Sequence, residues 1–160
     1  MDISKHSNGV KVGAGNSGVF INPASEVDSG IVIYTDTQGE SETNDERLII
    51  EGPGEYESAG IYIKGIKKNG VLSFVISYND REVYFTGSDG ISDIPEDAMY
   101  DAVVIETNEK LDPTKINKIS YPTIYLDKGN VLDGKIEAEK IKNVNLKKIT
   151  PEEKNIYILQ

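Results

Sequence analysis

The sequence predicts an α+β sandwich that is rich in strands and has few, short helices. Its branched apolar residues dominate, with 21 Ile and 12 Val against 7 Leu and 6 Ala, and β-branched side chains favour strands over helices. Its apolar segments are short and separated by Gly, Asn, Asp and Pro, as in strands joined by turns. Its later part alternates strand, helix and strand, the order of a βαβ crossover. Together these observations favour a mixed sandwich over an all-β barrel.

The expected strands follow one another at short intervals. The first two flank the turn-prone residues 13–18, and we interpret this glycine-rich segment as a hairpin loop rather than a dinucleotide site, because a strand follows it. Residues 30–34 are apolar throughout, which indicates a strand covered on both faces. Asn79-Asp80 joins two alternating segments in the clearest hairpin. The strands are expected at residues 9–12, 19–21, 30–34, 48–50, 60–66, 72–78, 81–86, 102–105, 123–126 and 155–159.

Two short helices are expected in the second half of the chain. Asp112 precedes Pro113 and Thr114, a combination that caps and starts a helix. Residues 136–141 predict another helix of similar length. No linker or repeat divides the sequence, so we expect a single domain over residues 1–160.

Composition excludes several classes of function. The chain has 17 Lys+Arg against 27 Asp+Glu, and a formal net charge of −10 disfavours nucleic acid as a partner. It has no Cys and one His, which excludes thiolate chemistry and any zinc site that needs two imidazoles. No apolar run approaches the roughly 20 residues of a membrane span, and the first residues lack the apolar core of a signal peptide. We expect a cytoplasmic protein that binds neither nucleic acid nor membrane.

Charge is segregated along the second half of the chain. Residues 84–113 carry eight acids and one base, whereas residues 114–154 carry nine Lys and six acids. Such runs usually form solvated faces. A sharper hypothesis is an acidic surface over residues 84–113 that docks a basic partner, in which case binding would depend steeply on salt.

A distinctive block, Glu-Gly-Pro-Gly-Glu-Tyr-Glu at residues 51–57, precedes the strand at 60–66. With this block the sequence resembles the metallo-β-lactamase superfamily, and in particular small bacterial metal-dependent hydrolases related to ascorbate-phosphate lactonase. The segments that follow are similar in their order, from the turn at residues 87–89 to the closing segment at 146–153. The resemblance implies a shortened αββα sandwich and argues for fold alone.

The block itself has a structural interpretation. Its glycines permit backbone angles that other residues avoid, and Pro53 fixes a turn. In the extended segment that follows, Glu55 and Glu57 share one face and Tyr56 takes the other. We therefore interpret the block as a structural turn rather than as a binding motif.

The resemblance implies a metal site of the form His-x-His-x-Asp-His after a buried strand, where imidazoles and a carboxylate bind two metals. After residues 30–34, however, this chain has Asp36 and Gln38 in place of the two leading histidines. Glu40 stands in place of the Asp, and Ser41 in place of the final His. A dinuclear zinc centre is therefore not expected.

The other ligand positions that the resemblance implies also lack histidine. The Gly-Asp turn is Gly87-Ser88-Asp89, and Asp127 follows the strand that in the family ends on a histidine. His6 lies far in sequence from all of these positions. Ser41, Ser77 and Ser88 have no candidate base near them in sequence, so a serine nucleophile is not expected.

These residues leave two hypotheses open. The first is a degenerate, non-catalytic domain without metal or cofactor, which works as a binding, scaffolding or assembly protein, with a protein partner or a second copy covering exposed sheet faces. The second is a divergent hydrolase with carboxylate-bound Mg²⁺ or Mn²⁺, since all-oxygen sites suit these ions. Its ligands would be the four carboxylates that follow strand ends: Asp36, Glu40, Asp89 and Asp127.

Overall fold

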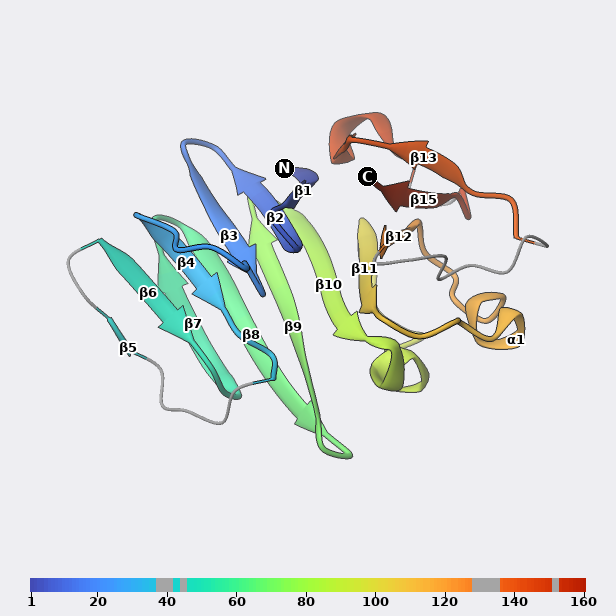
Figure 1. Ribbon diagram of the computed structural model, residues 1–160, viewed down its shortest axis with the longest axis horizontal. Coiled ribbons are helices and arrows are strands. Elements are labelled where there is room, and N and C mark those ends of the chain that lie inside the picture. The colour runs from blue at the N-terminus through green and yellow to red at the C-terminus, as the bar shows by residue number, and fades with distance from the viewer. Residues whose placement is uncertain (37–41, 44–45, 128–135, 151–152) are drawn as a thin grey trace.

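The computed structural model describes residues 1–36, 42–43, 46–127, 136–150 and 153–160, and their strands form two sheets (Figure 1). In spatial order, the first sheet comprises β14 (Asn143–Asn145), β1 (Asp2–His6), β2 (Gly9–Ala14), β3 (Ser17–Ile21), β4 (Gly30–Ile33), β6 (Arg47–Ile50) and β5 (Glu42–Thr43). The second comprises β13 (Glu139–Ile141), β15 (Ile156–Leu159), β12 (Thr123–Asp127), β11 (Ala102–Thr107), β10 (Arg81–Gly87), β9 (Val71–Tyr78), β8 (Ile61–Lys68) and β7 (Gly54–Ser58).

The first sheet contains the hairpin expected around residues 13–18. β2 and β3 pair antiparallel, with Ala14 opposite Ser17, and Gly15 adopts the positive φ of 62° that this tight turn requires. β3, β4 and β6 then run parallel. The side chains of β4 from Ile31 to Ile33 are buried on both faces, as its unbroken apolar sequence predicts.

The second sheet has an antiparallel half and a parallel half. β8, β9 and β10 form a meander, and the turn at Asn79-Asp80 has φ values of 49° and 59°, which match the twist of a two-residue hairpin. β10, β11, β12 and β15 run parallel. The crossover between β11 and β12 contains α1 (Pro113–Ile116), whose first turn is capped by Asp112 through the Thr114 N–H at 2.8 Å. Both the hairpin and the crossover are as predicted.

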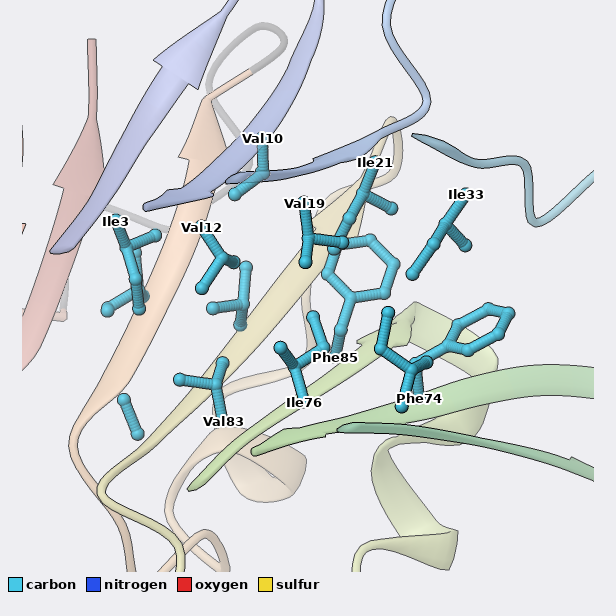
Figure 2. Close-up of a cluster of buried hydrophobic side chains, with 14 of the residues drawn as sticks. Ile3, Val10, Val12, Val19, Ile21, Ile33, Phe74, Ile76, Val83 and Phe85 are labelled. Atoms are coloured by element: carbon cyan, nitrogen blue, oxygen red, sulfur yellow. The ribbon is translucent and has the colours of Figure 1, made fainter. Parts of the chain in front are cut away.

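The main hydrophobic core lies between the two sheets. Alternate residues point inward from each strand, and Figure 2 shows side chains from the two sheets meeting across this space. The first sheet contributes Ile3, Val10, Val12, Val19, Ile21 and Ile33, and the second contributes Phe74, Ile76, Val83 and Phe85.

A second, smaller core covers the outer face of the parallel half of the second sheet. Outward side chains of β10 to β12, such as Tyr84 and Tyr125, pack against Ile91 of the 3₁₀ helix η1 (Ser88–Asp93) and Ile116 of α1. The tyrosine rings of this core form a chain of contacts, with centroids 5.1 Å apart for Tyr84 and Tyr100. The helical segments thus form a thin layer on this side.

The outer face of the first sheet carries no helix in the described residues and is covered by its own side chains. Some outward positions of β2 and β3 are glycines, and neighbouring side chains cover them. A Cβ on Gly18 would lie only 3.1 Å from Cε of Lys11, so the Lys11 side chain lies over this glycine. The Lys11 ammonium lies 5.3 Å from the centre of the Phe20 ring, and the His6 ring meets Phe20 edge to face at 4.8 Å. Lys11 and His6 therefore both contact the Phe20 ring on this face.

The structure departs from two expectations about helices. The strand-rich architecture with two sheets is observed, but the full αββα layering is not, because α1, η1 and a second 3₁₀ helix, η2 (Leu146–Lys148), are the helical segments in the described residues. The helix predicted at 136–141 is wrong, since β13 occupies part of this range and pairs parallel with β15. Pairing with an exposed strand edge satisfies the backbone there better than a short isolated helix would. No described helix has the length and apolar character needed to cross a membrane.

Candidate functional site

The candidate site lies where parallel strands of both sheets end. In the second sheet Gly87 is level with Glu106, and Thr107 is level with Asp127, so β10, β11 and β12 end at the same edge. A cleft of about 350 Å³ lies at this edge. Its described lining comprises Asn22, Thr35 and Asp36 after β3 and β4, Gly70 to Leu72 around the β8–β9 turn, Phe85 and Gly87 to Asp89 around the end of β10, and Glu106 to Glu109 around the end of β11.

Asn22 joins the two sheets at the floor of this cleft. Its Nδ2 donates hydrogen bonds to Oγ1 of Thr35 at 2.8 Å and to Oε2 of Glu106 at 2.7 Å. Its Oδ1 accepts a bond from the Thr35 N–H at 2.9 Å. The backbone of Asn22 has a φ of 47°, a conformation that Asn tolerates better than most residues. We call the side chains of Asn22, Thr35 and Glu106 the Asn22 bridge.

The walls of the cleft are also held in place. In η1, the Asp93 carboxylate forms an ion pair with Lys68 at 2.9 Å and accepts a hydrogen bond from Asn69 at 3.4 Å. At the turn from β10 into η1, a Cβ on Gly90 would lie only 2.0 Å from Oγ1 of Thr86, so a glycine is required there. In the opposite wall, the Thr107 hydroxyl accepts a bond from the Glu109 N–H at 3.0 Å.

The structure brings two of the four predicted carboxylates to the cleft. Asp36 and Asp89 both line it. Glu40 lies outside the described residues, together with Gln38 and Ser41. The backbone of Asp127 ends β12 beside Thr107, but its side chain lies outside the description. No group of three or more His, Cys, Asp and Glu in the described part of the chain is arranged to hold a metal.

The other candidate residues lie in structural positions or lack a basic neighbour. His6 belongs to β1 and contacts Phe20 on the outer face of the first sheet. The Ser77 hydroxyl donates to Glu82 at 3.0 Å across the β9–β10 hairpin. Ser88 lines the cleft, but the described lining contains no Lys, Arg or His. The cleft can therefore attract cations and hydrogen-bond donors, and its described side chains include no base of suitable strength to activate a serine.

Two important residues of the site were not among the predicted ones. Glu106 directly follows the buried residues 103–105 of β11, in the same way that Asp127 follows the buried residues 123–126 of β12. The pattern that predicted Asp127, a carboxylate directly after buried strand residues, therefore also occurs at Glu106. Asn22 follows β3 and precedes Pro23, and an Asn at such a turn signals a left-handed conformation.

The block at residues 51–57 serves the fold and does not line the cleft. The Tyr56 hydroxyl lies 3.2 Å from the carbonyls of both Gly52 and Pro53, and its ring packs against the main core. Gly54 has a φ of 147°, which favours glycine. A Cβ on Gly65 would lie 2.8 Å from the Gly52 carbonyl, so the bend packs closely on β8. These contacts agree with the structural interpretation of the block.

Comparisons with known proteins identify the fold. No family model matches the sequence, and no curated protein matches it significantly. The structure is similar to the crystal structure of a proposed zinc-dependent hydrolase of the metallo-β-lactamase superfamily from Thermotoga maritima. The TM-score is 0.71, with 15% identity over 99% of this chain and 98% of the other. The chain therefore has a metallo-β-lactamase-like fold, which confirms the resemblance inferred from its sequence.

Proposed function

We propose that this protein is a non-catalytic domain with a metallo-β-lactamase-like fold that works as a binding or assembly protein. The Asn22 bridge is the observation that carries this proposal. At the strand ends where the family resemblance implies metal ligands, this chain uses an amide, a hydroxyl and the Glu106 carboxylate to tie its two sheets together. A group held in such a network stabilises the fold and is less able to rearrange around a metal or a substrate.

The proposed partner is a protein, either another protein or a second copy of the chain. The outer face of β7 and β8 is a candidate binding surface for this partner, because it carries Tyr62, which is 59% exposed. β7 is also the edge of its sheet, and a strand edge offers unpaired backbone groups. A basic protein that docks on the acidic residues 84–113 is a narrower form of the same proposal, marked by steep salt dependence.

Sedimentation velocity over a range of concentrations tests self-association. A concentration-dependent dimer that is weakened by Tyr62→Ser would support assembly through the face of β8. Ser77→Ala is a matched control, since Ser77 is level with Tyr62 on the neighbouring strand but is less exposed. If the protein remains monomeric at all concentrations, self-association is excluded and the proposed partner is a different protein.

A second candidate function is a divergent hydrolase with a carboxylate-bound Mg²⁺ or Mn²⁺. One observation favours it, namely that Asp36 and Asp89 line the same cleft. The residues present fit such a site only in part, because Glu106 is engaged in the Asn22 bridge and the described acids form no cluster of three that could hold a metal. We therefore place it second.

Metal content and thermal stability distinguish the two functions. The protein is purified without chelator, its metal content is measured by elemental mass spectrometry, and its melting temperature is measured with Mg²⁺, Mn²⁺, Zn²⁺ or Ca²⁺ added. The non-catalytic proposal predicts no stoichiometric metal and no saturable stabilisation. The hydrolase would be favoured by a rise in melting temperature that saturates at one or two equivalents of metal. This rise should be lost in Asp36→Asn and in Asp89→Asn, and kept in the hairpin variant Asp80→Asn.

A further inference from the structure

A second pocket, of about 320 Å³, lies on the outer side of the second sheet. It lies between residues 91–96, which end η1 and continue beyond it, and residues 115–121, which end α1 and lead toward β12. None of its described lining residues also lines the cleft at the strand ends. We call it the lysine-rimmed pocket, and its described lining comprises Ile91, Ser92, Ile94, Pro95, Glu96, Lys115, Lys118, Ile119, Ser120 and Tyr121.

The walls of the lysine-rimmed pocket are apolar and held by specific contacts. Ile91, Ile119 and Tyr121 are buried members of the smaller core. The Tyr121 hydroxyl lies 2.6 Å from the Ala98 carbonyl and 2.9 Å from the Pro95 carbonyl, so it fixes the segment that forms one side. A pocket whose walls are already in place costs a ligand little ordering entropy.

The charges at the rim favour an anion. Lys115 and Lys118 are exposed, and within the described part of the chain neither ammonium forms a hydrogen bond or a close ion pair. The Asp112 carboxylate that caps α1 interacts with both lysine charges at longer range. Glu96 is the acidic residue of the described lining. Within the described lining, two lysines and one carboxylate give a net positive charge, in a chain whose overall net charge is −10.

We propose that the lysine-rimmed pocket binds a small amphipathic carboxylate, with its apolar body against Ile91, Ile94 and Ile119 and its head near Lys115 and Lys118. Apolar walls with a few polar groups at the mouth are typical of sites for such ligands. The lysine ammonium groups supply positive charge and hydrogen-bond donors in place of the water that a carboxylate loses when it binds. This site goes beyond the proposed protein-binding role and does not depend on it.

Titration with hexanoate and octanoate, followed by ¹H–¹⁵N NMR spectra of the full chain, tests the proposal. Saturable shifts are expected at the backbone amides of Ser92, Ile119 and Ser120. Because each buried methylene contributes about 0.8 kcal/mol, the two additional ones of octanoate should tighten binding about fifteenfold. Hexanol, which lacks the charge, should bind more weakly than hexanoate, and hexylamine should not bind.

Charge variants of the rim give opposite predictions. Lys115→Gln with Lys118→Gln should weaken octanoate binding about threefold to tenfold, whereas Glu96→Gln should tighten it. The matched control, Lys147→Gln with Lys148→Gln, removes the same charge from η2 and should leave binding unchanged. Equal binding of hexanol and hexanoate, equal effects of the two double lysine variants, or no saturable shift at the pocket amides would overturn the proposal. Urea unfolding of each variant confirms that the chain is folded.

Discussion

Replacing Asn22 with Gly removes every side-chain bond of the Asn22 bridge while permitting the φ of 47°. A hydrogen bond to a charged acceptor contributes about 2 kcal/mol and a neutral one about 1 kcal/mol. The bond to Glu106 and the two bonds with Thr35 therefore sum to about 4 kcal/mol. Because these groups are only partly buried, water replaces some of the loss, and we expect the free energy of unfolding to fall by about 2–4 kcal/mol.

Urea unfolding followed by circular dichroism measures this change. In thermal unfolding, the melting temperature should fall by about 4–16 °C, since 1 kcal/mol corresponds to roughly 2–4 °C for a chain of this size. Asn22→Ala should cost about 1 kcal/mol more than Asn22→Gly, because alanine is strained in the left-handed region. Asn22→Asp keeps an acceptor but places a second carboxylate beside Glu106, so it should be destabilised more at pH 7 than at pH 4.

Asn79→Gly is the matched control for the Asn22 bridge. Asn79 also has a positive φ, of 49°, but it lies exposed in the β9–β10 turn. Its replacement by Gly should change the free energy of unfolding by less than about 0.5 kcal/mol, as surface substitutions usually do. If Asn22→Gly were as mild as Asn79→Gly, the Asn22 bridge would not hold the sheets together, and the main support for a non-catalytic role would be lost.

Three further predictions concern the cores and the alkaline range. Tyr125→Phe should raise the free energy of unfolding by about 1–2 kcal/mol in urea titrations, because the buried Tyr125 hydroxyl has no hydrogen-bond partner among the described residues; a loss of stability would contradict this. Gly9→Ala should cost more than about 3 kcal/mol, since its Cβ would lie 2.0 Å from the Ile21 carbonyl oxygen, whereas Gly87→Ala, with 3.8 Å of space, should be mild. Burial raises the pKa of Tyr100 to about 12, so the unfolded chain releases its proton near pH 10 while the folded chain retains it. Stability should therefore fall between pH 10 and 12 by up to about 1.4 kcal/mol per pH unit, and less so in Tyr100→Phe.

Local sequence signals predicted the elements whose geometry depends on a few residues. Asn79-Asp80 specifies the β9–β10 turn because both residues tolerate a positive φ, and Asp112 with Pro113 specifies the start of α1. The segment at 136–141 was misassigned because its own pattern does not reveal the strand edge of β15, which becomes available only in the folded sheet. The predicted αββα sandwich has a second helical layer, and the described residues do not form it. On that face Phe20 and Lys11 cover the glycine positions, an arrangement that depends on neighbouring strands.

The candidate site was predicted in part for a related reason. The rule that side chains after buried parallel strands meet at one edge predicted Asp36 and Asp89 at the same edge, and both line the cleft. It could not reveal that Asn22 and Glu106, which are 84 residues apart in sequence, are hydrogen bonded. Such a pairing requires the relative position of the two sheets, which is a property of the whole core rather than of any segment.

The pairing of β1 with β14 has a consequence for the order in which the chain folds. Asp2 is level with Asn145, and the Leu146 N–H donates to the Met1 carbonyl at 3.2 Å, so this edge of the first sheet joins residues from near the two ends of the sequence. On the ribosome β1 can pair with β2, and the β8–β9–β10 meander can form, as soon as these segments emerge, whereas the pairing of β1 with β14 must wait for about 140 more residues. Contacts between such distant segments carry the largest loop-closure cost and slow folding. Closure of this seam is therefore expected to be a late step in synthesis, after the local hairpins have formed.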